Sequence, residues 1–132
     1  MSEENVDLVR RAFIAWQAGA LDELDALLAD DVVWRPTPLS GTGDQIFRGP
    51  RGVRDWISAV LSRQGEVRNE LDEFRDLGDR VLVLGRVFER VDEEVRADAE
   101  LAWLFQVRDG RIARGEGFLS RGDALRAAGI AT

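Results

Sequence analysis

The spacing of apolar residues divides the chain into a helical first half and a second half of strands. In the first segment, hydrophobic side chains recur every three or four residues, which is the period of one helix face. Acidic residues precede this stripe and Gly19 follows it, as is typical of the two ends of a helix. The residues of the stripe are Val6, Val9, Phe13 and Trp16.

Two further helices are predicted by the same criterion. The second has the stripe Leu21, Leu24, Leu27 and Leu28, and we expect Asp30 and Asp31 to form the turn into a short strand at 32–34. Pro50 suits the first turn of a third helix because its φ angle is already helical. The buried face of that helix would be Val53, Trp56, Ile57, Val60 and Leu61.

A segment rich in proline and glycine separates the short strand from the third helix. Five such residues within 14 positions favour a loop over any regular element. They are Pro36, Pro38, Gly41, Gly43 and Gly49.

Beyond Gly65 the hydrophobic period changes from helical to alternating. Strands are predicted at about 66–75, 80–91, 95–108 and 111–119, with turns at 78–79, 92–94 and 109–110. Asp109-Gly110 is a strong hairpin signal because this pair supports the positive φ angles of a tight primed turn. Ser120 and Asp123 resemble a capping box for a short final helix that ends at Gly129.

Helices followed by a run of antiparallel strands are typical of an α+β domain. The chain has 132 residues, which are enough for one hydrophobic core and too few for two. Residues 1–132 are therefore expected to form a single domain. A strongly bent sheet covered by three helices would enclose an apolar cone, which could hold a small ligand.

Composition excludes several classes of function. Hydrophobic residues make up 45% of the chain and charged residues 33%, a balance typical of globular proteins. No apolar run approaches the roughly 20 residues of a membrane span, and the acidic start lacks a signal peptide's basic region, so we expect a cytoplasmic protein with no membrane partner. The formal net charge of −7 also disfavours nucleic acid.

The missing residue types narrow the chemistry further. The chain has no His, Tyr, Lys or Cys, and all 18 of its basic residues are arginines. Proton transfer would therefore need an Asp or Glu with a raised pKa. Neither a cofactor nor a metal site is expected, because no loop has the ligand spacing of a calcium site.

Three segments carry a resemblance to a known family: VRRAFIAWQAGALDELDALLADDVVW, FRGPRGV and VRDGRIARGEGFLSRGDALRAAG. Together with the order of elements, they resemble the SnoaL-like branch of the nuclear transport factor 2-like (NTF2-like) superfamily, over nearly the whole chain. The resemblance implies a cone-shaped α+β barrel: a strongly curved, mostly antiparallel sheet wrapped over three N-terminal helices, with a short C-terminal helix. The superfamily contains isomerases, cyclases, dehydratases, epoxide hydrolases and non-catalytic carriers, so the fold alone does not select a function.

Ketosteroid isomerase is the member whose functional positions can be compared one by one. The resemblance puts Arg35 where that enzyme has its carboxylate base, in the context Val33-Trp34-Arg35-Pro36. Its oxyanion tyrosine would fall at Ala12 or Phe13, and its protonated aspartic acid at Trp103. All three positions lack the required chemistry, so that mechanism is not expected. The patterns of limonene epoxide hydrolase and scytalone dehydratase are incomplete as well.

The same resemblance, with strand alternation, predicts which side chains face the cone. Arg35 and Arg86 could clamp an acidic group or polarise a carbonyl, or could instead be held in ion pairs. Asp44 and Asp55 are weak candidates for an acid or base, as is Arg35 for a catalytic role. The predicted ligand-binding residues are Phe13, Trp16, Leu28, Arg35, Trp56, Leu84, Arg86, Phe88, Leu101, Trp103, Phe105, Gly115, Gly117 and Leu119.

Three hypotheses of function remain open. The first is a protein whose hydrophobic pocket binds a small apolar molecule carrying an acidic or carbonyl group. The second is an isomerase, cyclase or hydrolase of a polyketide, steroid or terpenoid-like substrate that uses an Asp or Glu base. The third is a purely structural domain with a filled cone. A homodimer is expected in every case, with Phe118 and Trp34 as candidate contacts.

Overall fold

The computed structural model describes residues 2–36, 45–61, 66–91 and 93–130. The predicted elements are present in the predicted order, and one further strand, 47–48, lies in the segment that was predicted as a loop. None of the described helices is long and apolar enough to cross a membrane. The helices are α1 (Ser2–Ala18), α2 (Leu21–Leu27), α3 (Gly49–Leu61) and α4 (Arg121–Ala127). The strands are β1 (Leu28–Arg35), β2 (Phe47–Arg48), β3 (Glu66–Asp76), β4 (Arg80–Val91), β5 (Glu94–Arg108) and β6 (Arg111–Phe118).

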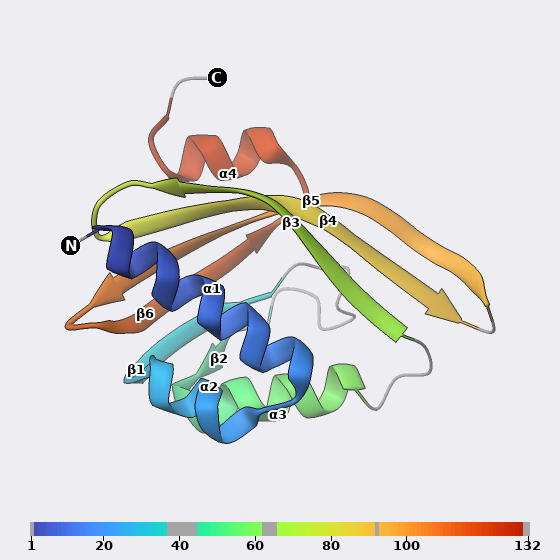
Figure 1. The fold of residues 1–132 in the computed structure, drawn as a ribbon, viewed down its shortest axis with the longest axis horizontal. Coiled ribbons are helices and arrows are strands. Elements are labelled where there is room, and N and C mark those ends of the chain that lie inside the picture. The colour runs from blue at the N-terminus through green and yellow to red at the C-terminus, as the bar shows by residue number, and fades with distance from the viewer. Residues whose placement is uncertain (1, 37–44, 62–65, 92, 131–132) are drawn as a thin grey trace.

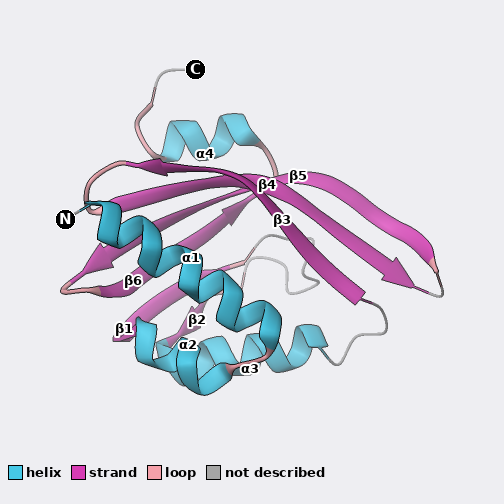
Figure 2. Cartoon of the chain, in the orientation of Figure 1, coloured by secondary structure: helices cyan, strands magenta, loops and turns pink. Residues whose placement is uncertain are grey.

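The described strands form one six-stranded sheet in the order β2-β1-β6-β5-β4-β3. Neighbouring strands are antiparallel except β1 and β6, which are parallel. The sheet is strongly curved but not closed, because β2 and β3 are its two edges (Figures 1 and 2). The predicted α+β class and cone are therefore confirmed, in the form of an open sheet.

The helices cover both faces of the sheet. Helices α1, α2 and α3 lie on one face, and α4 lies on the other (Figure 1). The first face, called here the inner face, carries the larger of two buried clusters, which includes Val9, Ile57 and Trp103. The outer face carries a smaller cluster in which Leu82, Leu84 and Ala102 pack with Ala124 of α4.

The predicted signals at the 109–110 turn and at the two ends of α4 are confirmed. Asp109 and Gly110 have φ angles of 53° and 75°, as a primed turn requires. The backbone N–H of Asp123 donates to Ser120 Oγ at 3.1 Å, which caps α4. Gly129 ends that helix with a φ of 77°.

The boundary between α2 and β1 differs from the prediction. Helix α2 ends at Leu27, and the strand begins at Leu28 rather than at Val32. Asp30 and Asp31 therefore belong to the strand, where the register with β6 is irregular between Leu28 and Val33. Arg108 of β5 forms an ion pair with Asp31. Pairing with a distant strand extends β1, and this pairing leaves no local signal in the sequence.

The predicted facing of β4 is wrong. Val81 and Val83 face the inner cluster, whereas Leu84 and Leu82 pack in the outer cluster. All residues from 81 to 85 are buried because helices cover both faces here. Alternation consequently carries no polar signal that could tell one face from the other. The pairing of Val83 with Trp103 of β5 decides the facing.

Candidate functional site

A cavity of about 60 Å³ lies between the three N-terminal helices and the inner face of the sheet. Its walls are aliphatic and aromatic, and none of the described residues that line it has an ionisable side chain. The lining residues are Ala12, Phe13, Trp16, Leu24, Leu28, Val32, Trp34, Val53, Trp56, Ile57, Phe105, Ile112 and Gly115.

Five aromatic rings form much of the wall, and we call them the aromatic wall: Phe13, Trp16, Trp34, Trp56 and Phe105. Trp56 contacts Trp34 edge to face and Trp16 at a tilt, with ring centroids 5.2 and 5.3 Å apart. Phe13 meets Phe105 edge to face at 5.6 Å. These geometries are the favourable ones for aromatic pairs, so each ring helps to hold its neighbours.

Gly115 of β6 allows two rings of the aromatic wall to meet across it. It pairs with Trp34 on one neighbouring strand and with Phe105 on the other. Side chains on strands two apart start about 9.5 Å from each other, yet the rings of Trp34 and Phe105 stack in parallel with centroids 6.2 Å apart. They approach because no side chain at residue 115 stands between them.

Two polar atoms of the aromatic wall are buried without a hydrogen-bond partner. They are the indole nitrogens Nε1 of Trp34 and Trp56. These two residues are only 8% and 5% exposed. An unsatisfied buried donor costs about 1–3 kcal/mol. Trp16 differs from them, because it alone among the described lining residues is not buried.

The structure places six of the predicted ligand-binding residues on the cavity wall. Leu101 and Trp103 also face the inner core, but they fill it and do not line the cavity. Gly117 pairs with Trp103 and is likewise absent from the wall. The six are Phe13, Trp16, Leu28, Trp56, Phe105 and Gly115.

Arg35 was predicted to face the cone and Trp34 to face outward, and both predicted orientations are wrong. Arg35 is exposed, whereas Trp34 is 8% exposed and lines the cavity. The register pairs Trp34 with Gly115 and Arg35 with Glu116, so the two side chains leave the strand on opposite faces. Trp34 therefore cannot serve as a surface for a dimer.

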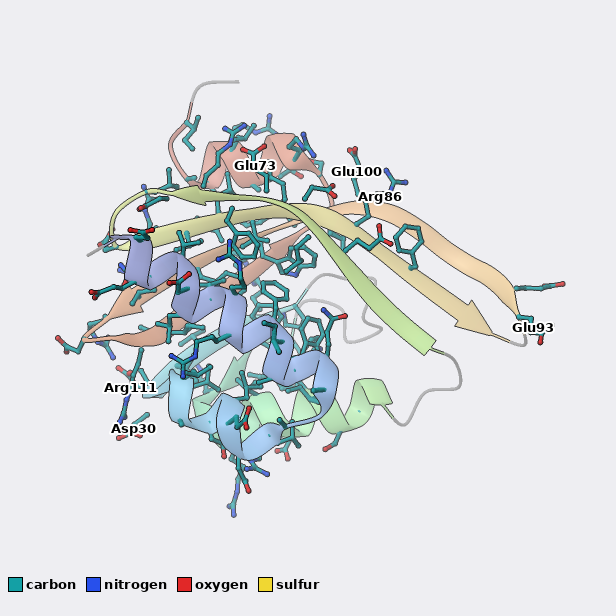
Figure 3. The ribbon with its side chains drawn as sticks, viewed as in Figure 1. Asp30, Glu73, Arg86, Glu93, Glu100 and Arg111 are labelled. Atoms are coloured by element: carbon teal, nitrogen blue, oxygen red, sulfur yellow. The ribbon has the colours of Figure 1, made fainter. Side chains whose placement is uncertain are left out.

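Two more of the predicted ligand-binding residues, Arg86 and Phe88, lie on the outer face. Arg86 is half-buried there and lies 3.9 Å from Glu100 across the β4–β5 pair. Figure 3 shows both side chains on the side of the sheet away from α1, α2 and α3. Phe88 follows Arg86 by strand alternation and shares this face. Leu119 comes after β6 and is 47% exposed, and Phe118 packs against the outer cluster.

The structure describes one of the two candidate carboxylates, and that one does not line the cavity. Asp55 is exposed on α3, and Asp44 lies outside the described residues. In the described part of the chain, no group of three or more acidic side chains could hold a metal ion. The described lining residues therefore supply apolar contact and no acid–base group.

An ion-pair cluster ties α2 to α3 beside the cavity. Arg54 Nε donates to Asp25 Oδ2 at 2.8 Å, and its Nη2 also pairs with Asp22. These bonds, the one to Asp25 first, raise the pKa of the Arg54 guanidinium above its ordinary value. The second oxygen of Asp25, Oδ1, is buried without a partner. Leu24 lines the cavity one residue before Asp25, so the cluster helps to fix this wall.

Sequence reasoning missed seven lining residues. Three of them, Leu24, Val53 and Ile57, belong to helical stripes that were predicted as buried, and nothing in a stripe separates core from cavity wall. Trp34 could have been found, because alternation from the buried Val32 places it on the same face. The seven are Ala12, Leu24, Val32, Trp34, Val53, Ile57 and Ile112.

Comparison with solved structures finds the same fold elsewhere. An NTF2-like protein from Burkholderia xenovorans is 28% identical, with a TM-score of 0.72 over 97% of this chain and 98% of that one. An NTF2-like protein of unknown function from Burkholderia pseudomallei is 25% identical, with a TM-score of 0.76 over 93% and 95%. An LEH-like epoxide hydrolase from M. tuberculosis is 20% identical, with a TM-score of 0.70 over 96% and 90%.

Sequence comparison identifies the family of the chain but no individual relative within it. None of the curated proteins matches the chain. The model of the SnoaL-like domain matches residues 9–115, which include every described residue that lines the cavity. The chain therefore belongs to the SnoaL-like domain family.

Proposed function

We propose that this protein binds a small apolar molecule in the cavity beneath α1. The observation that carries the proposal is the wall itself, in which five aromatic rings and several aliphatic side chains surround space that no described side chain fills. Apolar cavities of this kind stay dry and accept apolar molecules. The finer hypothesis of an acid held by Arg35 or Arg86 is not part of the proposal, because both arginines lie outside the wall.

The empty volume favours binding over a merely structural core. A cavity of about 60 Å³ exceeds the roughly 10–15 Å³ that one water molecule needs. Protein interiors rarely keep voids larger than a water molecule, because the lining atoms lose dispersion contacts. The same volume is below the roughly 300–1,000 Å³ of pockets for drug-sized ligands. We therefore expect a compact ligand, or a larger one that displaces Trp16.

An enzyme is the second hypothesis, and the wall gives it less support. The M. tuberculosis structure is an epoxide hydrolase, but at 20% identity it shares the fold alone. Acid–base catalysis needs an ionisable group within hydrogen-bond reach of the substrate. None of the described lining residues carries one.

Native mass spectrometry and calorimetric titration would test binding. The titration would use cyclopentanone and methylenecyclopentane, two compact rings of nearly the same shape. We expect saturable binding at one site, lost in Ala12→Leu, because the added carbons occupy the cavity from α1. Ile14→Leu is the matched control, since Ile14 lies on the same helix but is 62% exposed. Equal binding by wild type and Ala12→Leu would reject the cavity as the site.

We also propose a homodimer that uses the outer face of the sheet beyond α4. Arg86 and Glu100 lie on this face and are 39% and 58% exposed in their side chains. Light scattering coupled to size-exclusion chromatography tests this proposal. A monomeric mass at micromolar concentration would reject it.

A further inference from the structure

We propose that the cavity takes in hydrocarbon in preference to any polar group, and that a ligand keeps its polar groups in solvent beside Trp16. The preferred ligands are then hydrocarbons, or amphiphiles with a compact, unsubstituted hydrocarbon end. This inference rests on the proposed function and specifies which part of a ligand the cavity holds.

The buried part of the wall offers a ligand no hydrogen bond. None of the described side chains that line the cavity contains an oxygen atom. The indole nitrogens of Trp34 and Trp56 are covered by other protein atoms, so a molecule in the cavity does not reach them. A carbonyl or hydroxyl group that left water for this cavity would lose its hydrogen bonds and gain none in return. A hydrocarbon group has no such bonds to lose.

A charged group is excluded from the cavity more strongly than a neutral polar group. Burying an ion without a partner of opposite charge is very costly, and none of the described lining residues is ionisable. Arg35 is exposed, and Arg86 lies on the outer face beside Glu100. Arg54, next to the cavity, is already paired with Asp25. A ligand with a carboxylate must therefore keep it outside the cavity.

The small volume limits the buried part of a ligand to a compact group. The cavity measures about 60 Å³, whereas pockets that enclose most of a drug-sized ligand measure roughly 300–1,000 Å³. A longer molecule is therefore only partly enclosed. Its remaining part must leave the cavity on a side that reaches solvent.

Trp16 marks the side of the cavity that reaches solvent. It alone among the described lining residues is not buried. Its ring packs on Trp56, with centroids 5.3 Å apart, so it connects the aromatic wall to the surface. Tryptophan has an apolar body and a polar tip, which suits a boundary between apolar and hydrated space. A polar group beside Trp16 stays hydrated while the hydrocarbon end of the same molecule is buried.

The first measurement compares two isomers that differ in the position of one oxygen atom. 5-(3-Oxocyclopentyl)pentanoate carries a ketone on its ring, whereas 5-cyclopentyl-2-oxopentanoate carries the ketone beside the carboxylate. In calorimetric titration of the wild type, the second isomer should bind at least about tenfold more tightly, because the first buries an unpaired carbonyl oxygen. Methylenecyclopentane should likewise bind more tightly than cyclopentanone. The two isomers have the same formula and charge, so neither size nor net charge explains a difference between them.

A pair of variants on α1 checks that the ring of the tighter isomer enters the cavity. Ala12→Leu should abolish binding of 5-cyclopentyl-2-oxopentanoate, because the added carbons occupy the space that the ring needs. Ile14→Leu should bind it as the wild type does, since Ile14 is 62% exposed. Equal binding by the two variants overturns the inference.

The second measurement locates the polar end of the ligand by NMR of the wild type labelled with ¹⁵N. Its four tryptophans give four indole N–H signals, which Trp→Phe variants assign. 5-Cyclopentylpentanoate and its amide share the ring and the chain and differ only in the head group. Between these two complexes the Trp16 signal should move and the Trp34 and Trp56 signals should stay in place. Trp103, which fills the core and does not line the cavity, is the internal reference.

The possible results separate this inference from the proposed function. Tighter binding of the isomer with its ketone beside the carboxylate, together with a head-group effect confined to Trp16, supports the inference. Equal or tighter binding of the ring ketone, or a head-group effect at Trp34 or Trp56, overturns the inference and leaves the binding function intact. Binding of methylenecyclopentane without binding of 5-cyclopentylpentanoate does the same. Failure of every probe to bind at millimolar concentration overturns both proposals.

Discussion

Gly115 lies so close to Trp34 that a Cβ atom at residue 115 would stand 2.7 Å from Trp34 Cε3. The same atom would be 3.0 Å from Phe105 Cε1 on the other side. Real Cβ atoms do not approach other atoms as closely as 2.7 Å, so any side chain here would push the Trp34 ring. The glycine thus sets the shape of the cavity through the position of its neighbours.

Gly115→Ala should displace Trp34 and weaken binding of cyclopentanone. Overpacking a well-packed core costs about 1–3 kcal/mol, so we expect a loss of stability of that size in urea denaturation. Isothermal titration of the folded variant should show at least a severalfold weaker affinity. An unchanged affinity would mean that the Trp34 ring does not shape the site.

Gly122→Ala is the control for the preceding substitution. A Cβ atom there would meet only the end of the Arg126 side chain, at an ordinary 3.6 Å. Alanine is also favoured over glycine within a helix by about 1 kcal/mol. The variant should therefore be as stable as the wild type or more stable, with the same affinity for the probe.

Gly85→Ala should destabilise the fold without changing the cavity. A Cβ atom at residue 85 would lie 2.2 Å from the carbonyl oxygen of Glu70, next to the register shift between Leu71 and Glu73. The obstacle is backbone, so we expect a loss at or above the upper end of the roughly 1–3 kcal/mol of overpacking. Thermal unfolding would measure it. The folded fraction should bind cyclopentanone normally, because Gly85 does not line the cavity.

Trp16→Ala should make ligand exchange faster. Trp16 is the partly exposed member of the wall, and it packs on Phe13 and Trp56 at centroid distances of 5.9 and 5.3 Å. Its removal opens the side of the cavity nearest solvent and removes contacts to the ligand. Stopped-flow fluorescence should show higher association and dissociation rates. Unchanged rates would place the entrance elsewhere.

Arg35→Ala and Arg86→Ala should leave ligand affinity unchanged. Both side chains lie outside the cavity wall, so neither contacts a bound molecule directly. Calorimetric titration of cyclopentanone should give dissociation constants within twofold of the wild type. A tenfold loss of affinity in either variant would mean that this arginine contributes to ligand binding.

Arg54→Ala should lower stability by loosening α2 from α3. The variant leaves the half-buried Asp25 without its cation, and Asp25 already has one unpaired buried oxygen. Arg126→Ala, which removes the more exposed pair with Asp123 on α4, should have a smaller effect on the melting temperature. Equal decreases in melting temperature would mean that the α2–α3 ion pairs stabilise the fold no more than the exposed pair on α4 does.

The raised pKa of Arg54 fixes the sign of any pH effect from this group. A group with a raised folded-state pKa stabilises fully below its unfolded pKa and loses that contribution as pH rises through the folded one. For an arginine both pKa values lie far above neutral pH. Titration of Arg54 should therefore cause no change in the stability difference between wild type and Arg54→Ala from neutral to mildly alkaline pH.

Much of the fold could be predicted from short-range patterns. The helical stripe ending at Gly19, the Asp109-Gly110 turn and the Ser120 cap each depend on residues near one another in sequence, and each appears where it was predicted. Local chemistry fixes these features because the groups that satisfy the backbone lie within a few residues.

Only part of the candidate site was predicted, because the pattern of apolar residues shows the buried side of a helix but not of a strand that is buried on both faces. Helical stripes have one buried side, so Phe13, Trp16 and Trp56 were correctly placed toward the interior. Strand β4 has two buried sides, and the same kind of evidence assigned Leu84 and Arg86 to the wrong one.

The sequence alone determined the α+β class, the order of all elements except β2, and the lack of His, Tyr, Lys and Cys chemistry. Only the tertiary structure decided that Trp34 faces the cavity, that Arg35 faces outward and that two indole N–H groups have no partner. The reason is register: one residue of shift between β1 and β6 moves every side chain to the other face. The pairing of Trp34 with Gly115 joins residues far apart in the chain.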